Sequence, residues 1–241
     1  MTLRREGVRK TVRWMSGWML LFGLTIASSS EAWSQVPPSG DVPGDWVQSQ
    51  TRPDVRGTQG AVSSAHPLAT AAGYDILRRG GNAVDAAVTM AAVLAVVRPH
   101  MNGVGGDAFA LVYQAESRSV FGLNGSGRAG TLADPGFFRE RGIGGSIPGR
   151  GPMTVSVPGA VAAWADALER FGTLSLAEVL EPAIRYAAQG FPVSKRLGSD
   201  IAGAAGALNS PGRELYLPNG DPPEPGTLLR NPALARTLRA V

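Results

Sequence analysis

The chain of 241 residues is long enough for one domain or two small ones, and its 44% hydrophobic and 17% charged residues are typical of an ordinary globular protein. It has no cysteine and two histidines, which excludes disulfides, thiol nucleophiles, cysteine-ligated zinc and histidine-rich metal centres. The formal net charge is +4, but residues 1–34 hold five basic and two acidic residues, so the remainder is almost neutral. This argues against a nucleic-acid partner.

Residues 1–34 have the pattern of a secretory signal peptide. A basic segment precedes an uncharged stretch (residues 14–27), and small residues follow. Two cleavage positions fit, before Trp33 or before Gln35. An uncleaved membrane anchor is the alternative, but the apolar run is shorter than the roughly 20 residues that span a bilayer. We therefore expect export, to the periplasm or as a secreted protein, with no stable membrane span.

The rest of the chain divides into a linker, residues 35–56, and a domain, residues 57–241. The linker segment is rich in Pro, Gly, Asp and Gln and has no hydrophobic period. In the domain, a short strand is expected over residues 61–64. A helix then begins after His66, with Pro67 at its first position, where the missing N–H leaves no hydrogen bond unmade.

Two helices are predicted on either side of the glycine pair at positions 80 and 81. The first covers LATAAGYDILRR, whose apolar residues share one face, and the glycines end it. Asn82 caps the second, and Asp85 three residues later completes a short-chain variant of the capping box. We expect Asp85 to cap this helix rather than to act as an acid or base. The second helix, AVDAAVTMAAVLAVV, is apolar on nearly every side, which indicates a central, closely packed element.

A glycine-rich loop and a β-hairpin follow. The strands AFALVYQA and SVFGLNG are joined by a turn at residues 116–118. The loop Gly103–Asp107 is not a phosphate loop, because it lacks a Lys-Ser/Thr ending and precedes a strand. Its glycines either bring backbone close to a pocket or form a tight turn between helix and strand. Asp107 is either a hydrogen-bond acceptor within the loop or a group that faces a ligand.

The second half of the domain is predicted to be mainly helical. A segment rich in Gly and Pro, residues 142–153, leads to the helix AVAAWADALERFG, and Ser175 caps the helix SLAEVLEPAIRYAAQG. Residues 193–209 have a helical pattern. Residues 210–227 are predicted to be a polar loop, and residues 232–241 begin another helix.

Two stretches resemble the N-terminal part of γ-glutamyltranspeptidases, also called γ-glutamyltransferases or glutathione hydrolases, in the Ntn-hydrolase superfamily. They are GAVSSAHPLATAAGYDILRRGGNAVDAAVTMAAVLAVVRPHMNGVGGDAFALV and PMTVSVPGAVAAWADALERFGTLSLAEVLEPAIRYAAQGFPVS. The resemblance covers residues 57–241, and the combination of residues 81–87 with the glycine loop is specific. It implies the α+β class, as part of an αββα sandwich that is incomplete at its C-terminus.

The resemblance also implies a precursor that cuts itself. The new N-terminal threonine, in a Thr-Thr-His-like context, is then the nucleophile, and its own α-amino group serves as base. No threonine of this chain is followed by Thr-His. Ser63, Ser64 and His66 are close in sequence but do not form a nucleophile elbow, and we expect His66 to be structural. We assign no catalytic residue to this chain, and whether it is an enzyme by itself stays open.

Arg128 and Ser126 are the candidate substrate-binding residues. Transpeptidases of this family hold the α-carboxylate of the γ-glutamyl group with an arginine in an Asp-Phe-Arg-Glu-like stretch on the second hairpin strand. A planar guanidinium suits a carboxylate because it makes paired hydrogen bonds. In an ungapped alignment Ser126 takes the place of that arginine, and Arg128 lies two residues later, on the same face if the strand continues. This departure favours a divergent, acylase-like branch.

The predicted function is therefore that of an exported γ-glutamyltransferase-like or glutathione hydrolase-like amidohydrolase. It hydrolyses or transfers a γ-glutamyl or similar acyl group of a small molecule, and its catalytic threonine comes from a C-terminal portion or small subunit outside this chain. Two alternatives stay open: an acylase for other amides such as β-lactam side chains, and an inactive fragment with a structural or binding role. The mechanism needs no cofactor and no metal. The acyl donor, the acceptor and the oligomeric state are not determined.

Overall fold

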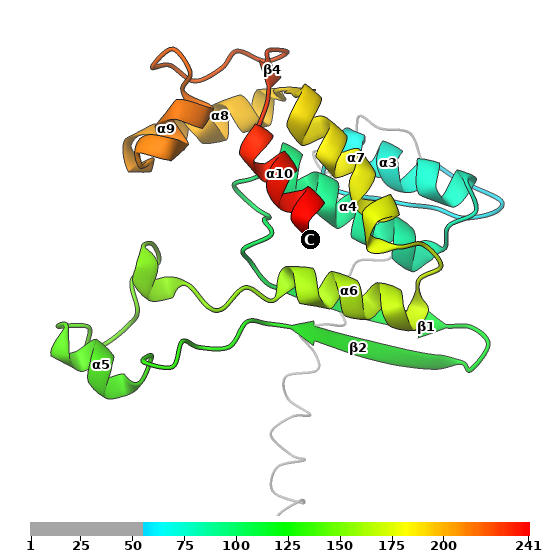
Figure 1. Cartoon of the computed structure of the whole chain (residues 1–241), viewed down its shortest axis with the longest axis horizontal. Helices are drawn as coiled ribbons and strands as arrows, with labels where there is room; N and C mark the ends of the chain where they lie inside the picture. The colour runs from blue at the N-terminus through cyan, green and yellow to red at the C-terminus, as the bar shows by residue number, and fades with distance from the viewer. Residues whose placement is uncertain (1–54) are drawn as a thin grey trace, which may run out of the picture. The chain divides into compact units, whose positions relative to one another are not determined.

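The computed structural model describes residues 55–241 (Figure 1). The predicted signal peptide and nearly all of the predicted linker lie outside the described residues. Gly57–Val241 forms one compact unit. Its helices and strands, in chain order, are α3 (Pro67–Arg78), α4 (Ala83–Val97), β1 (Ala108–Gln114), β2 (Ser119–Gly125), α5 (Pro135–Glu140), α6 (Ala160–Phe171), α7 (Leu176–Gln189), β3 (Phe191–Pro192), α8 (Lys195–Ala204), α9 (Ser210–Tyr216), β4 (Leu228–Leu229) and α10 (Pro232–Ala240).

The first helix begins where the sequence predicts, but the expected strand before it does not form. Pro67 opens α3, and Nδ1 of His66 accepts a hydrogen bond from the backbone N of Leu68 at 3.2 Å. Residues 61–64 have no regular structure. The Ser64 hydroxyl instead donates to the backbone oxygen of His66 and lies 2.8 Å from the Thr70 hydroxyl. The segment is therefore fastened to the helix start, and no strand pairs with it in the described part of the chain.

Asp85 caps α4 as predicted and also joins two distant parts of the fold. Asn82 accepts hydrogen bonds from the first turn of α4, and Asp85 accepts one from the backbone N of Asn82 at 2.8 Å. The same carboxylate accepts three more, from the backbone N and hydroxyl of Thr173 and from the backbone N of Leu174. The turn between α6 and α7 is thereby held against the N-terminus of α4.

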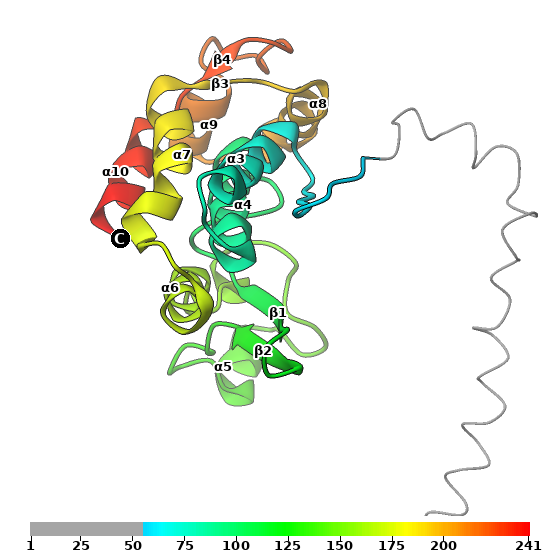
Figure 2. The same cartoon turned by 90° about the vertical axis from the view of Figure 1, so that its right-hand side faces the viewer.

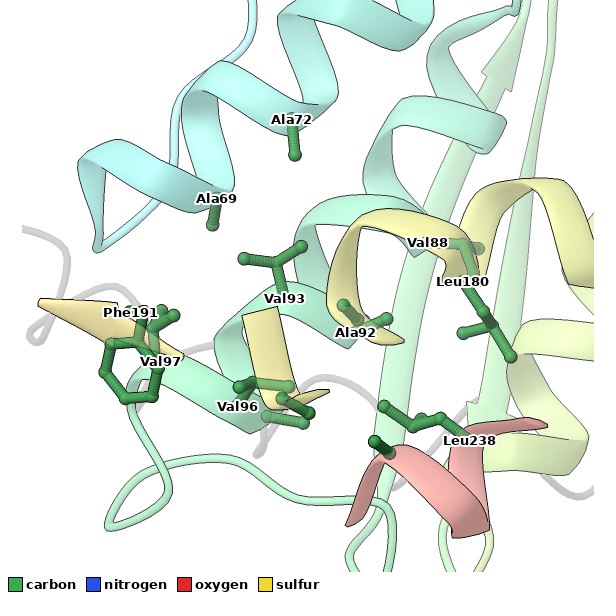
Figure 3. Packing of buried hydrophobic residues seen from close by; sticks show 14 of the residues in the cluster. Ala69, Ala72, Val88, Ala92, Val93, Val96, Val97, Leu180, Phe191 and Leu238 are labelled. Carbon is green, nitrogen blue, oxygen red and sulfur yellow. The ribbon is translucent and has the colours of Figure 1, made fainter. Parts of the chain in front are cut away.

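The hydrophobic core surrounds α4, which packs against α3, α6 and α7, with α10 lying on α7. Figure 3 shows Ala69 and Ala72 of α3 facing Val93 of α4. Small alanines at this contact let two helices approach closely. Larger side chains from the later elements, including Leu180, fill the remaining space. The prediction of a central apolar helix is confirmed.

The later helices follow the predicted pattern with two exceptions: α5 (Pro135–Glu140), which the sequence analysis did not predict, and α9. Residues 210–227 are not all loop, since α9 occupies Ser210–Tyr216. Asn209 caps it by accepting a hydrogen bond from the backbone N of Gly212 at 3.0 Å, and Pro211 sits in the first turn. Leu217, just after α9, is buried in the core. Asn209 and Pro211 are helix-start signals, but they stand in a polar stretch that resembles a loop. The prediction of a loop was wrong for Ser210–Tyr216.

The hairpin forms a layer of its own on one side of α6. β1 and β2 pair antiparallel, from Ala108 opposite Gly125 to Gln114 opposite Ser119. Helix α6 contacts this hairpin and also α4 and α7, so it lies between the strands and the other helices (Figures 1 and 2). A second, short antiparallel pair, β3 with β4, lies near α8. The α+β class expected from the sequence is confirmed.

Candidate substrate-binding face

The two faces of the hairpin have different surroundings. On the face toward α6, the Phe121 and Phe171 rings lie 5.2 Å apart between centroids. The opposite face is open in the described part of the chain: it exposes the large apolar side chains of Phe109, Leu111, Tyr113 and Val120. Leu111 is 82% exposed. This apolar row is referred to below as the open face.

Ser126 and Arg128 continue the open face beyond the end of β2. The strand ends at Gly125, yet the alternation of exposure persists: Asn124, Ser126 and Arg128 are exposed, and Gly127 is half-buried. The backbone N of Ser126 donates to Oδ1 of Asn124 at 3.0 Å. The guanidinium of Arg128 has no hydrogen-bond or ion-pair partner within residues 55–241. The apolar row of the open face is thus followed, beyond the end of β2, by a polar end that carries the guanidinium of Arg128.

Three glycines allow the chain to cross the start of α6 behind these residues. A Cβ on Gly127 would overlap the backbone oxygen of Val157, and one on Gly125 would overlap the side chain of Ala163. A Cβ on Gly159 would likewise overlap the backbone oxygen of Gly125. The backbone N of Val157 donates to the backbone oxygen of Arg128 at 2.9 Å. The strand end is therefore pressed onto the segment that leads into α6.

The glycine loop, residues 103–107, also contacts the start of α6. The backbone oxygen of Gly106 accepts hydrogen bonds from the backbone N of Gly159 at 3.1 Å and of Ala160 at 2.9 Å, which satisfies two free donors at the start of α6. Asp107 accepts from the backbone N of Gly127 and from the Ser156 hydroxyl. Asp107 is thus a hydrogen-bond acceptor, but for donors outside its own loop. Sequence reasoning missed Ser156, because only the fold brings it to Asp107.

A groove of 550 Å³ runs between α4, β1 and α6. Its walls are formed mainly by small and apolar side chains, including Ala83, Ala87 and Trp164, and no charged side chain lines it. Such walls can bury apolar groups, and Tyr113 is the one residue among them with an ionisable side chain.

Both histidines have structural roles. His66 is buried at the start of α3, and burial together with the charge of Arg98 lowers its pKa below the usual value. Nε2 of His100 lies 3.0 Å from Oδ2 of Asp200, which also accepts from Arg196. Burial lowers the pKa of His100 although the Asp200 carboxylate opposes this shift. In the described residues, no group of three acidic, histidine or cysteine side chains is placed to hold a metal ion.

Comparison with known proteins identifies the family. The family model described as Gamma-glutamyltranspeptidase matches residues 69–241. This chain belongs to the γ-glutamyltranspeptidase family. The glutathione hydrolase-like YwrD proenzyme of Bacillus subtilis is 49% identical over 141 residues, which cover 58% of this chain and 26% of the relative. The oxamate amidohydrolase proenzyme of Klebsiella pneumoniae is 39% identical over 191 residues, 76% of this chain and 35% of the relative.

A solved structure agrees with this assignment to the γ-glutamyltranspeptidase family. The crystal structure of cephalosporin acylase from Bacillus halodurans matches with a TM-score of 0.70 and 38% identity, over 80% of this chain and 38% of that chain. The expected Ntn-hydrolase fold, incomplete in this chain, is thereby confirmed. The chain spans between 26% and 38% of the length of these three proteins. None of the helices in the described residues is long and apolar enough to cross a membrane.

Proposed function

We propose that this chain is the N-terminal part of the large subunit of an exported Ntn amidohydrolase that cleaves or transfers the acyl group of small amides. Membership of the γ-glutamyltranspeptidase family supports the reaction class. Two of the similar proteins are named proenzymes, which supports a precursor that is processed. The nucleophilic threonine is supplied by the C-terminal portion outside this chain, and its own amine can serve as base without a cofactor.

The observation that carries the proposal for this chain is the unpartnered guanidinium of Arg128. Its backbone oxygen is held by the backbone N of Val157, while its side chain is exposed at the end of the open face. An arginine that no acid neutralises is suited to a carboxylate ligand, since it can offer two parallel N–H donors. We assign to Arg128 the contact with a carboxylate of the acyl donor, with the Ser126 hydroxyl beside it.

A serine at position 126 favours an acyl donor other than a γ-glutamyl group. A hydroxyl cannot neutralise the α-carboxylate that the family arginine holds, and Arg128 lies about 7 Å farther along an extended chain. A dicarboxylic acyl group such as glutaryl keeps a carboxylate at the same carbon spacing from the amide but lacks the α-amino group of a γ-glutamyl donor, so a single guanidinium is enough to hold it. The second candidate is therefore an acylase for such amides, including β-lactam side chains.

The test uses the full-length gene product with γ-glutamyl and glutaryl anilides. Replacement Arg128→Ala is expected to raise KM for the preferred carboxylate-bearing donor about tenfold to a hundredfold, the loss expected for a hydrogen bond to a charged group. Arg150→Ala is the matched control, because Arg150 is also exposed and without a partner in the described residues. Equal KM values for the two variants would refute the role of Arg128. Fast γ-glutamyl turnover by the wild type would refute the acylase candidate.

The gene itself decides between an enzyme and an inactive fragment. Sequencing beyond the codon for Val241 is expected to find a reading frame that continues into a Thr-Thr-His-like segment. A stop codon without such a segment in any nearby frame would favour a structural or binding role. N-terminal sequencing of the exported product is expected to begin at Trp33 or Gln35.

A further inference from the structure

We propose that Asp107 is a positioning residue that fixes the backbone of residues 126–128 and so sets where the guanidinium of Arg128 meets the carboxylate of the acyl donor. The inference rests on the proposed function, because it concerns the same substrate contact. It assigns to the glycine loop a role in substrate selection in addition to its role in the turn before β1.

Asp107 joins three segments that are distant in the sequence. Its Oδ1 accepts a hydrogen bond from the backbone N of Gly127 at 2.8 Å and lies 3.3 Å from the donating Ser156 hydroxyl. Gly127 is the residue directly before Arg128. The Asp107 carboxylate therefore holds the peptide unit between Ser126 and Gly127, one unit before the peptide bond to Arg128.

Arg128 is held from its other side by the segment before α6. Val157 donates its backbone N to the backbone oxygen of Arg128 at 2.9 Å, one residue after Ser156. A Cβ on Gly127 would overlap the backbone oxygen of Val157, so the backbone of Gly127 cannot move closer to Val157. Because the side chain of Arg128 makes no hydrogen bond or ion pair within residues 55–241, the two backbone hydrogen bonds are the polar contacts that position this residue.

Asp107 leaves the guanidinium of Arg128 available, because no ion pair joins the two side chains. Such an ion pair would compete with substrate for the guanidinium. Here the Asp107 oxygen that faces the strand end is used by a backbone N–H and a hydroxyl, and no ion pair forms between Asp107 and Arg128. The acid thus orders the arginine without neutralising it.

Two measurements on the full-length gene product test the inference. Hydrogen exchange is followed in peptides that contain Gly127, and KM and kcat are measured for a carboxylate-bearing anilide and for its neutral ester. In Asp107→Ala we expect exchange at Gly127 to accelerate about tenfold and KM for the charged donor to rise about threefold to tenfold, as for the loss of one or two ordinary hydrogen bonds. The kcat value and the KM for the neutral ester are expected to stay unchanged.

Asp107→Asn is expected to restore both values toward wild type, since its amide oxygen can accept the same hydrogen bonds. Asp134→Ala is the matched control: Asp134 accepts from the backbone N of Gly136 and Phe137 at the start of α5 and does not contact residues 126–128. Unchanged exchange in Asp107→Ala, or an equal rise of KM for both donors, would overturn the inference while leaving the proposed function intact. A wild type that hydrolyses no amide would instead refute the proposed function, and the substrate role of Asp107 with it.

Discussion

Asp85 shows how one side chain can serve both a helix and the tertiary fold. Its carboxylate is fully buried and accepts four hydrogen bonds, one from its own helix start and three from the turn between α6 and α7. Burial alone raises the pKa of a carboxyl group, but these hydrogen bonds outweigh it, so the pKa of Asp85 lies below its usual value. The charged form is therefore the one that stabilises the fold.

Replacing Asp85 by Asn is expected to lower the free energy of unfolding at pH 7 by about 1–3 kcal/mol, since hydrogen bonds to a charged group are lost. Because the folded-state pKa is lowered, the stability from Asp85 is present above the unfolded-state pKa and is lost as the pH falls through the folded-state pKa. The difference between wild type and variant should thus shrink below about pH 4. Urea unfolding at pH 7 and pH 3 measures this, with the exposed Asp75→Asn as control. A pH-independent difference would contradict it.

Thr89, unlike Asp85, is a buried polar residue whose side chain makes no hydrogen bond in the described part of the chain. It is fully buried in α4, and its Oγ1 has no hydrogen-bond partner among residues 55–241. Thr89→Val keeps the shape and removes the unpaired group, so we expect the free energy of unfolding to rise by about 1 kcal/mol. Thr70→Val, whose hydroxyl is paired with Ser64, should instead be destabilising. Thermal unfolding distinguishes the two, and a destabilised Thr89→Val would reveal a partner of the hydroxyl.

The contact between the hairpin and α6 sets the position of the candidate site at the level of elements. It depends on glycines at the end of β2, where strand and helix start approach more closely than a side chain allows. The same contact carries the hydrogen bonds of the glycine loop to α6. Loss of this crossing would release the strand end that bears Ser126 and Arg128.

Gly127→Ala is expected to lower the free energy of unfolding by about 1–3 kcal/mol, the usual cost of forcing an extra methyl group into a packed contact. Gly130→Ala is the matched control three residues away, since nothing lies within 4 Å of its Cβ position. Denaturant unfolding of both variants measures the effect. Equal stability of the two variants would show that the crossing can open to accept a side chain.

In the described part of the molecule, the open face exposes several large apolar side chains. The hairpin is a sheet of two strands in the described part of the chain, and Phe109, Leu111, Tyr113 and Val120 are exposed on it. Isolated two-stranded sheets are marginally stable, and apolar strands with free edges associate.

The 241-residue chain by itself is expected to self-associate or aggregate. The double variant Leu111→Lys and Val120→Lys, which charges the open face, should shift sedimentation toward the monomer. Leu228→Lys is the control, because Leu228 is exposed outside the hairpin. A wild-type chain that sediments as a monomer at all concentrations and melts cooperatively would contradict this expectation.

Local signals in the sequence predicted the longer helices, the hairpin and the family: Pro67, Asn82 and Ser175 mark helix starts, and alternation marks the strands. The sequence did not reveal α5 or α9, because six or seven residues are too few to show a helical period, and it predicted a strand at residues 61–64 that lacks a partner in the described part of the chain. The role of Asp107 and the availability of Arg128 follow from the three-dimensional contacts alone. Both depend on hydrogen bonds between residues 20 to 49 positions apart, and local sequence patterns carry no information on such pairings.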